Sequence, residues 1–458
     1  MDTSIFKAYD VRGLYPEQVN EDAAWKIGHA SAQFLRSLLQ GFERGQANAQ
    51  SVVVGRDMRK HSPSVQQALI EGMIGSGANV INVGMIDTPQ IYFAINHLGT
   101  CGGVQVTASH NPAQYNGFKV SGLKARPIGG DTGLKEIKHI ATALKHTQSA
   151  GKGTVTEVDL SEPYRNHVLS FLKSDSKKIK MVIDASNGMA GKWVPIIFGG
   201  LDIEIIPINF EHDGTFKHDP NPLVESNLVE LKETVLAKNA DIGVCFDGDA
   251  DRLLVIDEKG NTVGCDITTA LMAGYFLKDN PGSTVVYDLR SSWVVKEEIE
   301  AKGGIPRRDR VGHAFMKKTL KDTKACFGGE LSGHFYYRDN YFADSGMITL
   351  VHLINILSAT DKSMSEIIKP LLRYSSSGEL NFKVEEKEDM MKQLAEKYAD
   401  GQVDWLDGIT VQLGDWWFNC RPSNTEPLLR LNVEAKTPEL LKAKLGELKE
   451  MLGEPVDH

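Results

Sequence analysis

Short apolar runs alternate with longer helical segments along the first three quarters of the chain. Residues 51–54 form a strand-like run, residues 64–75 have a helical pattern, and residues 79–83 and 103–106 are strand-like again. Strands that alternate with helices are typical of βαβ units, in which neighbouring strands run parallel. The pattern therefore predicts an α/β fold with largely parallel sheets.

The same order of elements recurs twice further along the chain. One copy has strand-like runs at residues 180–183 and 242–246, and another has them at 284–288 and 324–327. In each copy a polar loop follows the later strand, and ligands of parallel sheets gather at the carboxyl ends of strands. We therefore expect three related α/β domains whose polar loops face one cleft.

The last part of the chain has a different pattern. Residues 373–378, Arg-Tyr-Ser-Ser-Ser-Gly, are typical of a flexible linker. Three closely spaced strands are predicted after them, at residues 409–413, 416–420 and 428–434. A final helix should begin with Thr437 as its N-cap and Pro438 at its first position, which completes a smaller α+β domain with an antiparallel sheet. The predicted domain boundaries are residues 1–150, 151–261, 262–372 and 373–458.

Composition and charge limit the possible functions. The 458 residues are 41% hydrophobic and 24% charged, as in an ordinary globular protein, and the net charge of −9 argues against a nucleic-acid binder. No apolar run approaches the roughly 20 residues that span a bilayer, and residues 1–15 lack the apolar core of a signal peptide. We therefore expect a cytoplasmic protein that binds neither nucleic acid nor membranes. The five cysteines are widely spaced, so we interpret them as structural.

Ser109 lies in the sequence Thr-Ala-Ser-His-Asn-Pro, directly after a predicted strand. The Asn-Pro step and the Asn-Gly step at residues 116–117 are typical of turns, so we expect an exposed loop at the end of that strand. A serine in such a loop could be a turn residue, a helix cap or a nucleophile.

Asp247, Asp249 and Asp251 follow another predicted strand. Because they are two residues apart, an extended segment would direct all three carboxylates to one side. Carboxylates about 4 Å apart repel each other by about 1–4 kcal/mol per pair, and a bound cation removes that repulsion. Hard oxygen ligands in small number favour Mg²⁺. An acidic turn exposed to solvent is the alternative.

Two further loops carry groups suited to a phosphorylated sugar. Residues 421–425, Arg-Pro-Ser-Asn-Thr, combine a fork-shaped cation, two hydroxyls and an amide, and successive N–H groups in such a turn bind anions. An ordinary hairpin loop is the alternative. Residues 330–334, Glu-Leu-Ser-Gly-His, offer hydrogen-bonding groups for sugar hydroxyls, and residues 307–313 add arginines and a histidine that can titrate near neutrality.

The four loops, in this order, resemble those of the α-D-phosphohexomutase superfamily, in particular its bacterial phosphomannomutase/phosphoglucomutase branch. The resemblance covers essentially the whole chain. It implies three related α/β domains and a smaller α+β domain around a central cleft. It also implies interconversion of hexose 1-phosphate and hexose 6-phosphate, with mannose first and glucose also plausible, through a phosphoserine and a hexose 1,6-bisphosphate.

The resemblance also assigns roles to individual residues. Ser109 would carry the phosphoryl group and, with Asp247, Asp249 and Asp251, bind Mg²⁺. Glu330 and Ser332 would contact sugar hydroxyls, and the phosphate that is not reacting would be held by Arg421, Ser423, Asn424 and Thr425. Further residues match positions that line the family's active site: Tyr9, Arg12, Lys119, Arg252, Arg290 and His313. Among these we expect Lys119, Arg12, Arg252 and His313 to be catalytic, and Tyr9 and Arg290 to bind substrate.

Two positions qualify the resemblance. Arg290 falls where some relatives have lysine, and arginine and lysine form different hydrogen bonds. Leu331 resembles the methionine of the mannose/glucose branch, whereas the glucosamine branch typically has glutamine there. Phosphoglucosamine mutase therefore stays an alternative, as does a Mg²⁺-dependent sugar phosphatase with Asp247 as its nucleophile. A sugar-phosphate sensor without turnover is a third possibility.

The chemistry of the implied mechanism agrees with the residues. A phosphoserine brings a charge of about −1.5 to −2, so cations must surround it. Lys119, Arg12 and Arg252 could supply them together with Mg²⁺. The bisphosphate, which also serves as activator, must turn over before Ser109 takes back a phosphate, which suits a phosphate clamp on a mobile domain. We expect small phosphosugars as the partners and a monomer or weak dimer.

Overall fold

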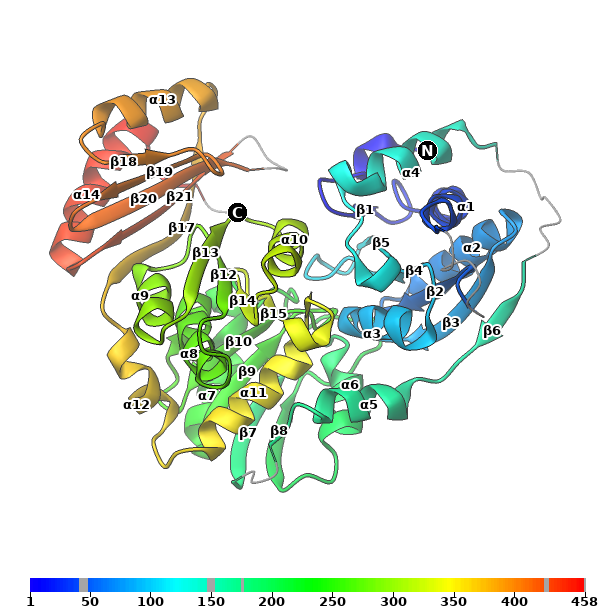
Figure 1. Ribbon diagram of the computed structural model, residues 1–458, viewed down its shortest axis with the longest axis horizontal. Coiled ribbons are helices and arrows are strands. Elements are labelled where there is room, and N and C mark those ends of the chain that lie inside the picture. Colours follow the sequence, from blue (N-terminus) through cyan, green and yellow to red (C-terminus); the bar gives the residue numbers. More distant parts are fainter. Residues whose placement is uncertain (41–47, 146–152, 174–176, 424–427, 457–458) are drawn as a thin grey trace. The chain divides into compact units, whose positions relative to one another are not determined.

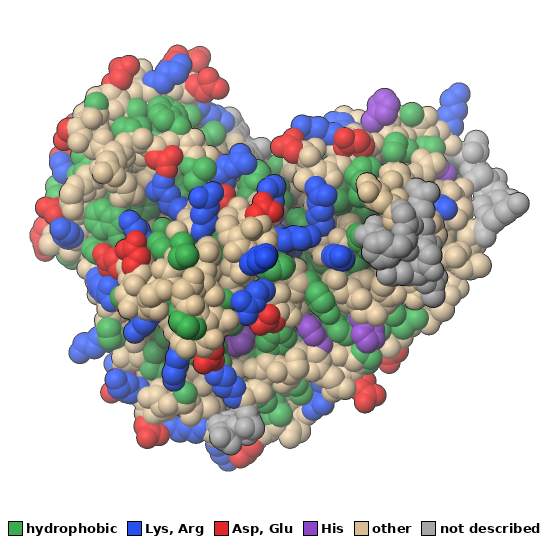
Figure 2. All heavy atoms as spheres, viewed as in Figure 1, with side chains coloured by type: hydrophobic (Ala, Val, Ile, Leu, Met, Phe, Trp, Pro, Cys, Tyr) green, Lys and Arg blue, Asp and Glu red, His purple; other side chains and the backbone are tan. Residues whose placement is uncertain are grey.

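The computed structural model describes residues 1–40, 48–145, 153–173, 177–423 and 428–456. The chain forms two compact units, which are described separately (Figure 1). The first unit contains Met1–Val263 and Ser332–Ser365, and the second contains Gly264–Leu331 and Glu366–His458. Among the residues described, no helix has both the length and the apolar character to cross a membrane. The face of the molecule in Figure 2 carries both acidic and basic side chains among polar and apolar ones.

The first unit begins with a six-stranded mixed sheet. Its strands lie in the order β1 (Val11–Leu14), β5 (Tyr115–Gly122), β4 (Gly102–Val106), β2 (Ser51–Arg56), β3 (Asn79–Met85) and β6 (Val155–Glu157). The four strands from β4 to β6 run parallel, and β5 pairs antiparallel with both β4 and β1. The strands predicted over residues 51–54, 79–83 and 103–106 are therefore confirmed.

Four helices accompany this sheet, namely α1 (Glu21–Ser37), α2 (Ser62–Gly75), α3 (Thr88–Leu98) and α4 (Lys135–Ala143). Side chains of Asn20 and Asp87 cap α1 and α3 by accepting backbone N–H bonds. The helices α1 and α2 pack closely because Gly28 of α1 faces the backbone of Leu69 in α2, and Gly72 of α2 faces the backbone of Trp25 in α1. A Cβ at Gly28 would lie 2.1 Å from the carbonyl oxygen of Leu69, so only glycine allows this approach.

A second mixed sheet follows in the first unit. Its order is β11 (Thr262–Val263), β10 (Leu253–Asp257), β9 (Ile242–Phe246), β7 (Ile179–Asp184) and β8 (Ile203–Ile208). β7 runs parallel to β8 and β9, whereas β10 is antiparallel to β9 and β11. The accompanying helices are α5 (Ser161–Leu169), α6 (Ala190–Phe198) and α7 (Val229–Lys238). The hairpin β15 (Phe335–Tyr337) and β16 (Ala343–Asp344) and helix α11 (Gly346–Ser358) complete the unit.

The second unit contains three parallel strands of the third α/β repeat. β12 (Thr284–Asp288) lies between β13 (Ile305–Asp309) and β14 (Phe327–Gly329), with helices α8 (Cys265–Asp279), α9 (Trp293–Ala301) and α10 (His313–Thr323). The strand predicted over residues 324–327 is wrong by three residues. Lys324 has a left-handed backbone (φ 52°) that ends α10, and the chain must leave this conformation before a strand can begin.

The C-terminal part of the second unit is an antiparallel sheet with two helices. The strand order is β17 (Ser375–Lys383), β21 (Leu428–Ala435), β20 (Trp416–Pro422), β19 (Ile409–Leu413) and β18 (Gln402–Asp404). Helices α13 (Lys387–Lys397) and α14 (Pro438–Leu452) cover it, and the short helix α12 (Met364–Ile368) precedes it along the chain. Thr437 caps α14 by accepting the N–H of Leu440 at 3.2 Å. The predicted α+β domain is confirmed.

The flexible linker predicted at residues 373–378 is wrong. Its last four residues open strand β17, in which Ser375 pairs with Ala435. Arg373 and Tyr374 are held by α9, because both donate hydrogen bonds to Glu297, at 3.0 and 2.5 Å. Serine-rich composition suggests flexibility, but hydrogen bonds of the sheet and charged anchors order this segment.

Candidate active site

The serine loop, residues 107–116, follows β4 as predicted; its residues 113–114 are exposed, but Ser109 is buried. Ser109 is only 1% exposed and has a left-handed backbone (φ 50°), and its N–H donates to Thr107 Oγ1 at 2.9 Å. The loop of residues 247–251 packs directly on it, because a Cβ at Gly248 would lie 2.5 Å from the carbonyl oxygen of Ser109. The expectation of an exposed serine is therefore wrong, since turn residues in the sequence do not reveal what packs over a loop.

The hydroxyl of Ser109 faces residues 247–251, which we call the acidic loop. Its Oγ donates a hydrogen bond of 2.9 Å to Asp247 Oδ2 and lies 3.4 Å from His110 Nδ1. Burial lowers the pKa of His110 well below its ordinary value, and the nearby cations, Arg252 first, lower it further. His110 is therefore neutral and does not add charge beside the serine.

The three aspartates converge, although not by the predicted geometry. Residues 248–249 form a turn and Ala250 has a left-handed backbone (φ 57°), so the segment is not extended. Nevertheless, one oxygen each of Asp247, Asp249 and Asp251 lies within 4.8 Å of the others, and all three side chains are buried. The turn, rather than a two-residue alternation, brings these carboxylates together.

Neighbouring segments fix the backbone of the acidic loop. Ser186 Oγ donates to the carbonyl of Phe246 at 2.6 Å, and the N–H of Met189 donates to the carbonyl of Gly248 at 2.9 Å. The N–H of Thr88, at the start of α3, donates to the carbonyl of Asp249 at 3.0 Å. The carboxylates are thus held in position by three separate backbone contacts.

Lys119 on β5 is the cation closest to the acidic loop among those described. Its Nζ donates to Asp249 Oδ2 at 2.7 Å and to Asp251 Oδ2 at 2.6 Å. Burial alone would lower the pKa of Lys119, but the three carboxylates outweigh it and raise the pKa. Burial, together with the charges of Asp251 and Asp249, raises the pKa of Asp247 well above its ordinary value. Burial also acts to raise the pKa of Asp251, but Lys119, His334 and Arg252 lower it overall.

This arrangement fits a divalent cation. Asp249 Oδ1 is buried and has no hydrogen-bond partner among the residues that the structure describes. An unpaired buried carboxylate oxygen is costly, and three close carboxylates carry more negative charge than Lys119 neutralises. Hard oxygen donors of this kind suit Mg²⁺. The residues present therefore fit a magnesium ion.

Two of the predicted arginines lie beside this centre. Arg12 on β1 donates from Nη1 to Asn111 Oδ1 of the serine loop at 2.6 Å and also pairs with Asp10. The N–H of Arg252 donates to Asp247 Oδ1 at 3.2 Å, and its Nε lies 3.8 Å from Asp247 Oδ2. Tyr9 lies just before β1 and is half-buried.

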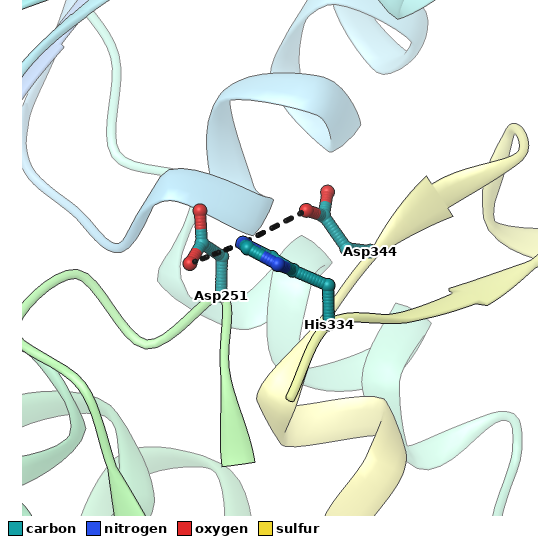
Figure 3. A group of neighbouring side chains, drawn as sticks. All are labelled: Asp251, His334 and Asp344. Carbon is teal, nitrogen blue, oxygen red and sulfur yellow. Dashed lines mark ion pairs between the residues drawn. The ribbon is translucent and has the colours of Figure 1, made fainter. Parts of the chain in front are cut away.

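His334 belongs to the same centre, although it was not among the predicted site residues. Figure 3 shows its ring between the carboxylates of Asp251 and Asp344. Its Nε2 lies 3.3 Å from Asp251 Oδ1 and 3.9 Å from Asp344 Oδ2, and its Nδ1 lies 2.9 Å from Ser332 Oγ. Ser332 therefore reaches the acidic loop through His334. The signal for His334 was its position at the end of the 330–334 loop.

The remaining predicted residues lie in the second unit. Arg290, after β12, is oriented by Asp288, to which its Nη2 donates at 2.8 Å. Its Nη1 donates to Glu379 Oε2 at 3.2 Å, and Arg421 Nη2 donates to the same oxygen at 2.8 Å. Arg430 completes the cluster by donating to Glu379 Oε1 at 3.0 Å. One carboxylate on β17 thus brings Arg290 and Arg421 together.

The charges in this arginine cluster are only partly balanced. Although burial acts to raise it, the pKa of Glu379 is lowered to about 2 by Arg290, Arg421 and Arg430. Burial lowers the pKa of Arg421, and Arg290 lowers it further, so Glu379 offsets only part of the cost. Arg421 Nε is also buried without a hydrogen-bond partner among the described residues. With Asp288 on Arg290 and Glu379 between the arginines, the cluster carries three positive and two negative charges. The net positive charge suits an incoming anion.

Glu330 and Ser423 follow strands of the same unit, and His313 is the first residue of helix α10. Glu330 is buried after β14, and its Oε1 accepts the N–H of Gly312 at 2.9 Å, directly before His313 begins α10. The N–H of Leu331 donates to Asp288 Oδ2 at 2.7 Å. Ser423 follows β20, whereas Asn424 and Thr425 lie outside the described residues. Glu379 and Arg430 were missed, because Glu379 directly follows the supposed linker of residues 373–378 and Arg430 lies inside a predicted strand.

Comparison with known proteins identifies the family. Models of the phosphoglucomutase/phosphomannomutase family match four consecutive stretches: α/β/α domain I at residues 3–148, domain II at 162–260, domain III at 265–374 and the C-terminal domain at 379–450. The chain therefore belongs to the phosphoglucomutase/phosphomannomutase family. It is a phosphohexomutase, an isomerase that moves a phosphoryl group within a hexose phosphate.

Individual relatives agree over nearly the full length. A phosphomannomutase of Escherichia coli K12 is 36% identical over 462 residues, covering 98% of this chain and 99% of its own. A phosphomannomutase of Vibrio cholerae is 38% identical over 459 residues, covering 98% of both chains. The crystal structure of a phosphoglucomutase/phosphomannomutase family protein from Burkholderia thailandensis has a TM-score of 0.88 and 32% identity, covering 99% of this chain and 97% of its own.

Proposed function

We propose that this phosphohexomutase interconverts mannose 1-phosphate and mannose 6-phosphate, and the glucose phosphates as a second pair, through phosphorylated Ser109. The observation that carries the proposal is the hydrogen bond of 2.9 Å from Ser109 Oγ to Asp247, inside a buried group of three carboxylates. The preference for mannose is supported by the two relatives named phosphomannomutase.

Asp247, Asp249 and Asp251 would hold Mg²⁺ together with an oxygen on Ser109. When bound, the ion would neutralise charge on the phosphoryl oxygens beside the serine. The fit rests on the unpaired, buried Asp249 Oδ1 among the described residues and on the convergence of the three carboxylates within 4.8 Å.

The reaction needs two transfers in each cycle. In the first, the bond between phosphorus and Ser109 Oγ breaks as a bond forms to a sugar hydroxyl oxygen. The sugar hydroxyl loses one proton, and the serine oxygen gains one. The product is a hexose 1,6-bisphosphate. In the second transfer, the bond between the other phosphorus and its sugar oxygen breaks as a bond forms to Ser109 Oγ. Ser109 loses its proton again, and the sugar oxygen gains one. The same bisphosphate, added from solution, would phosphorylate an unmodified enzyme and so act as activator.

Cations of the first unit would stabilise the charge that moves. Lys119 Nζ already lies 2.6–2.7 Å from two of the carboxylates, and Arg12 Nη1 lies 2.6 Å from Asn111 in the serine loop. The side chain of Arg252 lies beside Asp247, with its Nε 3.8 Å from Asp247 Oδ2. These side chains are fixed before the phosphoryl group arrives, which is the condition under which electrostatic stabilisation of a transition state is most effective.

The second unit would bind the rest of the substrate. Arg421, Ser423, Asn424 and Thr425 would hold the phosphate that is not reacting, with Arg290 beside them, because a guanidinium fork binds two phosphate oxygens at once. Glu330 and His313 would contact the sugar, together with Ser332 and Tyr9 of the first unit. This phosphate site must accept either end of the hexose, so it should recognise phosphate rather than the ring.

A coupled assay and mass spectrometry together test the proposal. Mannose, glucose and glucosamine 1-phosphates are each supplied with Mg²⁺ and a trace of the matching 1,6-bisphosphate, and the 6-phosphate and inorganic phosphate are both measured. The proposal requires 6-phosphate from mannose 1-phosphate, no equivalent release of inorganic phosphate, and one phosphate on Ser109. Release of inorganic phosphate alone would indicate the phosphatase, and preference for the glucosamine compound would indicate phosphoglucosamine mutase.

A further inference from the structure

Arg59 is a buried arginine that follows β2 and lies beneath the serine loop. Its side chain is inaccessible to solvent, and the whole residue is 1% exposed. No charged substrate could reach it, so its role must be exerted on the residues that it contacts. Its contacts satisfy every N–H group of the guanidinium.

All five N–H groups of the Arg59 guanidinium have acceptors. Nη2 donates to the carbonyl oxygens of Ser109 at 2.9 Å and Asn111 at 2.6 Å. Nη1 donates to those of Pro112 at 2.6 Å and Tyr115 at 3.1 Å. The fifth group, Nε, donates to Asp57 Oδ2 at 3.1 Å. One side chain therefore satisfies four carbonyls of the loop that carries Ser109.

Asp57 fixes the orientation of this fork. Its Oδ1 accepts the backbone N–H of Arg59 at 3.1 Å and the hydroxyl of Ser62 at 2.5 Å, and Asp57 itself is buried. The ring of Phe216 lies against the guanidinium, with its centroid 5.2 Å from Cζ. The guanidinium is therefore held on its edge by a carboxylate and on its face by an aromatic ring.

The serine loop needs such an anchor. Ser109 has a left-handed backbone, which non-glycine residues seldom adopt, so the surrounding structure must hold it there. The carbonyls at 109, 111, 112 and 115 point inward, where a buried acceptor must find a donor. A planar guanidinium can reach several of them at once, whereas a lysine ammonium has three donors on a single nitrogen.

We propose that Arg59 is a positioning residue for phosphoryl transfer: through four carbonyls it holds Ser109 in the backbone conformation from which the serine oxygen gives up and takes back the phosphoryl group. The inference rests on the proposed function of Ser109. Each cycle uses that oxygen twice, and an error of about 1 Å in a reacting group can slow a reaction about 100-fold. Substrate binding does not depend on Arg59, because it contacts no residue of the proposed phosphate site.

The test compares Arg59→Lys with Arg56→Lys. Lysine at 59 keeps the positive charge but cannot reproduce the five-bond fork. Arg56 is the matched control, because it ends the same strand and its Nη1 donates to the carbonyl of Asp57 rather than to the serine loop. The measurements are single-turnover phosphorylation of dephosphorylated enzyme by glucose 1,6-bisphosphate, kcat and KM for mannose 1-phosphate, and hydrogen exchange of residues 107–116.

For Arg59→Lys we expect the phosphorylation rate and kcat to fall together, by about 10- to 100-fold, with KM within about threefold of wild type. Exchange in residues 107–116 should rise, and Arg56→Lys should behave as wild type in all three measurements. Wild-type rates in Arg59→Lys would overturn the inference, and so would a change confined to KM.

Two further arms keep the outcomes distinct. If Arg59→Lys does not fold, Asp57→Asn decides, since it leaves the Arg59 side chain and its four carbonyl acceptors in the protein but weakens the contacts of Asp57 to Arg59 and Ser62 that orient the guanidinium. A slower phosphorylation in that folded variant supports the inference, and an unchanged rate overturns it. If the wild-type enzyme takes no phosphate onto Ser109, the proposed function fails. If the wild-type enzyme and Arg59→Lys both take up phosphate at the same rate, only the inference about Arg59 fails.

Discussion

The hydroxyl of Ser109 donates to the carboxylate of Asp247 across 138 residues of sequence, at 2.9 Å. This contact is favourable only while the serine carries a proton. A phosphoryl group on the same oxygen would replace the donor by about −1.5 to −2 units of charge beside three carboxylates. Lys119, Arg12 and Arg252 are too few to balance the charge of the phosphoryl group and three carboxylates, so the phosphorylated form requires the cation that the carboxylates can bind.

The first prediction concerns Ser109 itself. Ser109→Ala should lower kcat by at least about 1,000-fold, because it removes the oxygen that would carry the phosphoryl group. The fold should persist, because the change removes only one hydroxyl and its hydrogen bond, a loss of about 1 kcal/mol. Intact-mass and peptide mass spectrometry should find one phosphate on Ser109 in active wild-type enzyme. Ser121→Ala, at a buried serine of β5, is the control. A fully active enzyme that never carries the phosphate during turnover contradicts the prediction.

The second prediction concerns the metal. Asp249→Asn should weaken Mg²⁺ binding by at least about tenfold, because it removes one charged oxygen ligand. Chelation should stop turnover of the wild-type enzyme, and added Mg²⁺ should restore it. Calorimetric titration with Mg²⁺ measures the affinity directly, and Asp241→Asn, at an exposed position, should bind as wild type does. Undiminished activity in excess chelator would rule out a required metal.

Sequence patterns predicted the strands and the order of the polar loops well, because both depend on local alternation and on turn residues. They failed where a long-range contact decides the outcome. The burial of Ser109 depends on the loop that contains Gly248. The convergence of the aspartates was predicted, but it comes from a turn with the left-handed Ala250 rather than from an extended segment. Ser375 belongs to a strand only because Ala435 pairs with it. His334 and Arg59 were missed for the same reason, since their partners lie far away in the sequence.

The third prediction follows from the low pKa of Glu379. A glutamate whose pKa falls from 4.5 in the unfolded chain to about 2 in the folded protein stabilises the fold above pH 4.5 and loses this contribution as the pH falls toward 2. The contribution is on the order of 3 kcal/mol. Glu379→Gln should therefore be less stable than wild type at pH 7, and the difference should shrink between pH 4.5 and 2.

Chemical denaturation of both proteins across that range measures the difference. Glu388→Gln, at an exposed position of α13, controls for the loss of one negative charge. If the difference in the free energy of unfolding between wild type and Glu379→Gln does not change with pH, the charge of Glu379 does not stabilise the fold.

The fourth prediction concerns Arg421. Arg421→Ala should raise KM for mannose 1-phosphate by about 10- to 100-fold, because a charge-assisted hydrogen bond contributes about 1.5–3 kcal/mol in ground and transition states alike. Arg421→Lys should lie between this variant and wild type, since it keeps the charge but loses the fork. Ser109 should still accept phosphate from hexose 1,6-bisphosphate in both variants.

Because the bisphosphate must reorient within a cycle, we further expect the C-terminal domain to move. The segment before this domain is not the flexible linker that the sequence suggested, so the movement must have another hinge. Movement relative to β12 would have to break the contact from Arg290 to Glu379, so phosphate that competes for these arginines should favour it. Small-angle scattering with and without glucose 1,6-bisphosphate should show a change in the radius of gyration in wild type, and a larger ligand concentration should be needed in Arg421→Ala. An unchanged KM in Arg421→Ala, together with scattering that ligand does not alter, would contradict both the clamp and the movement.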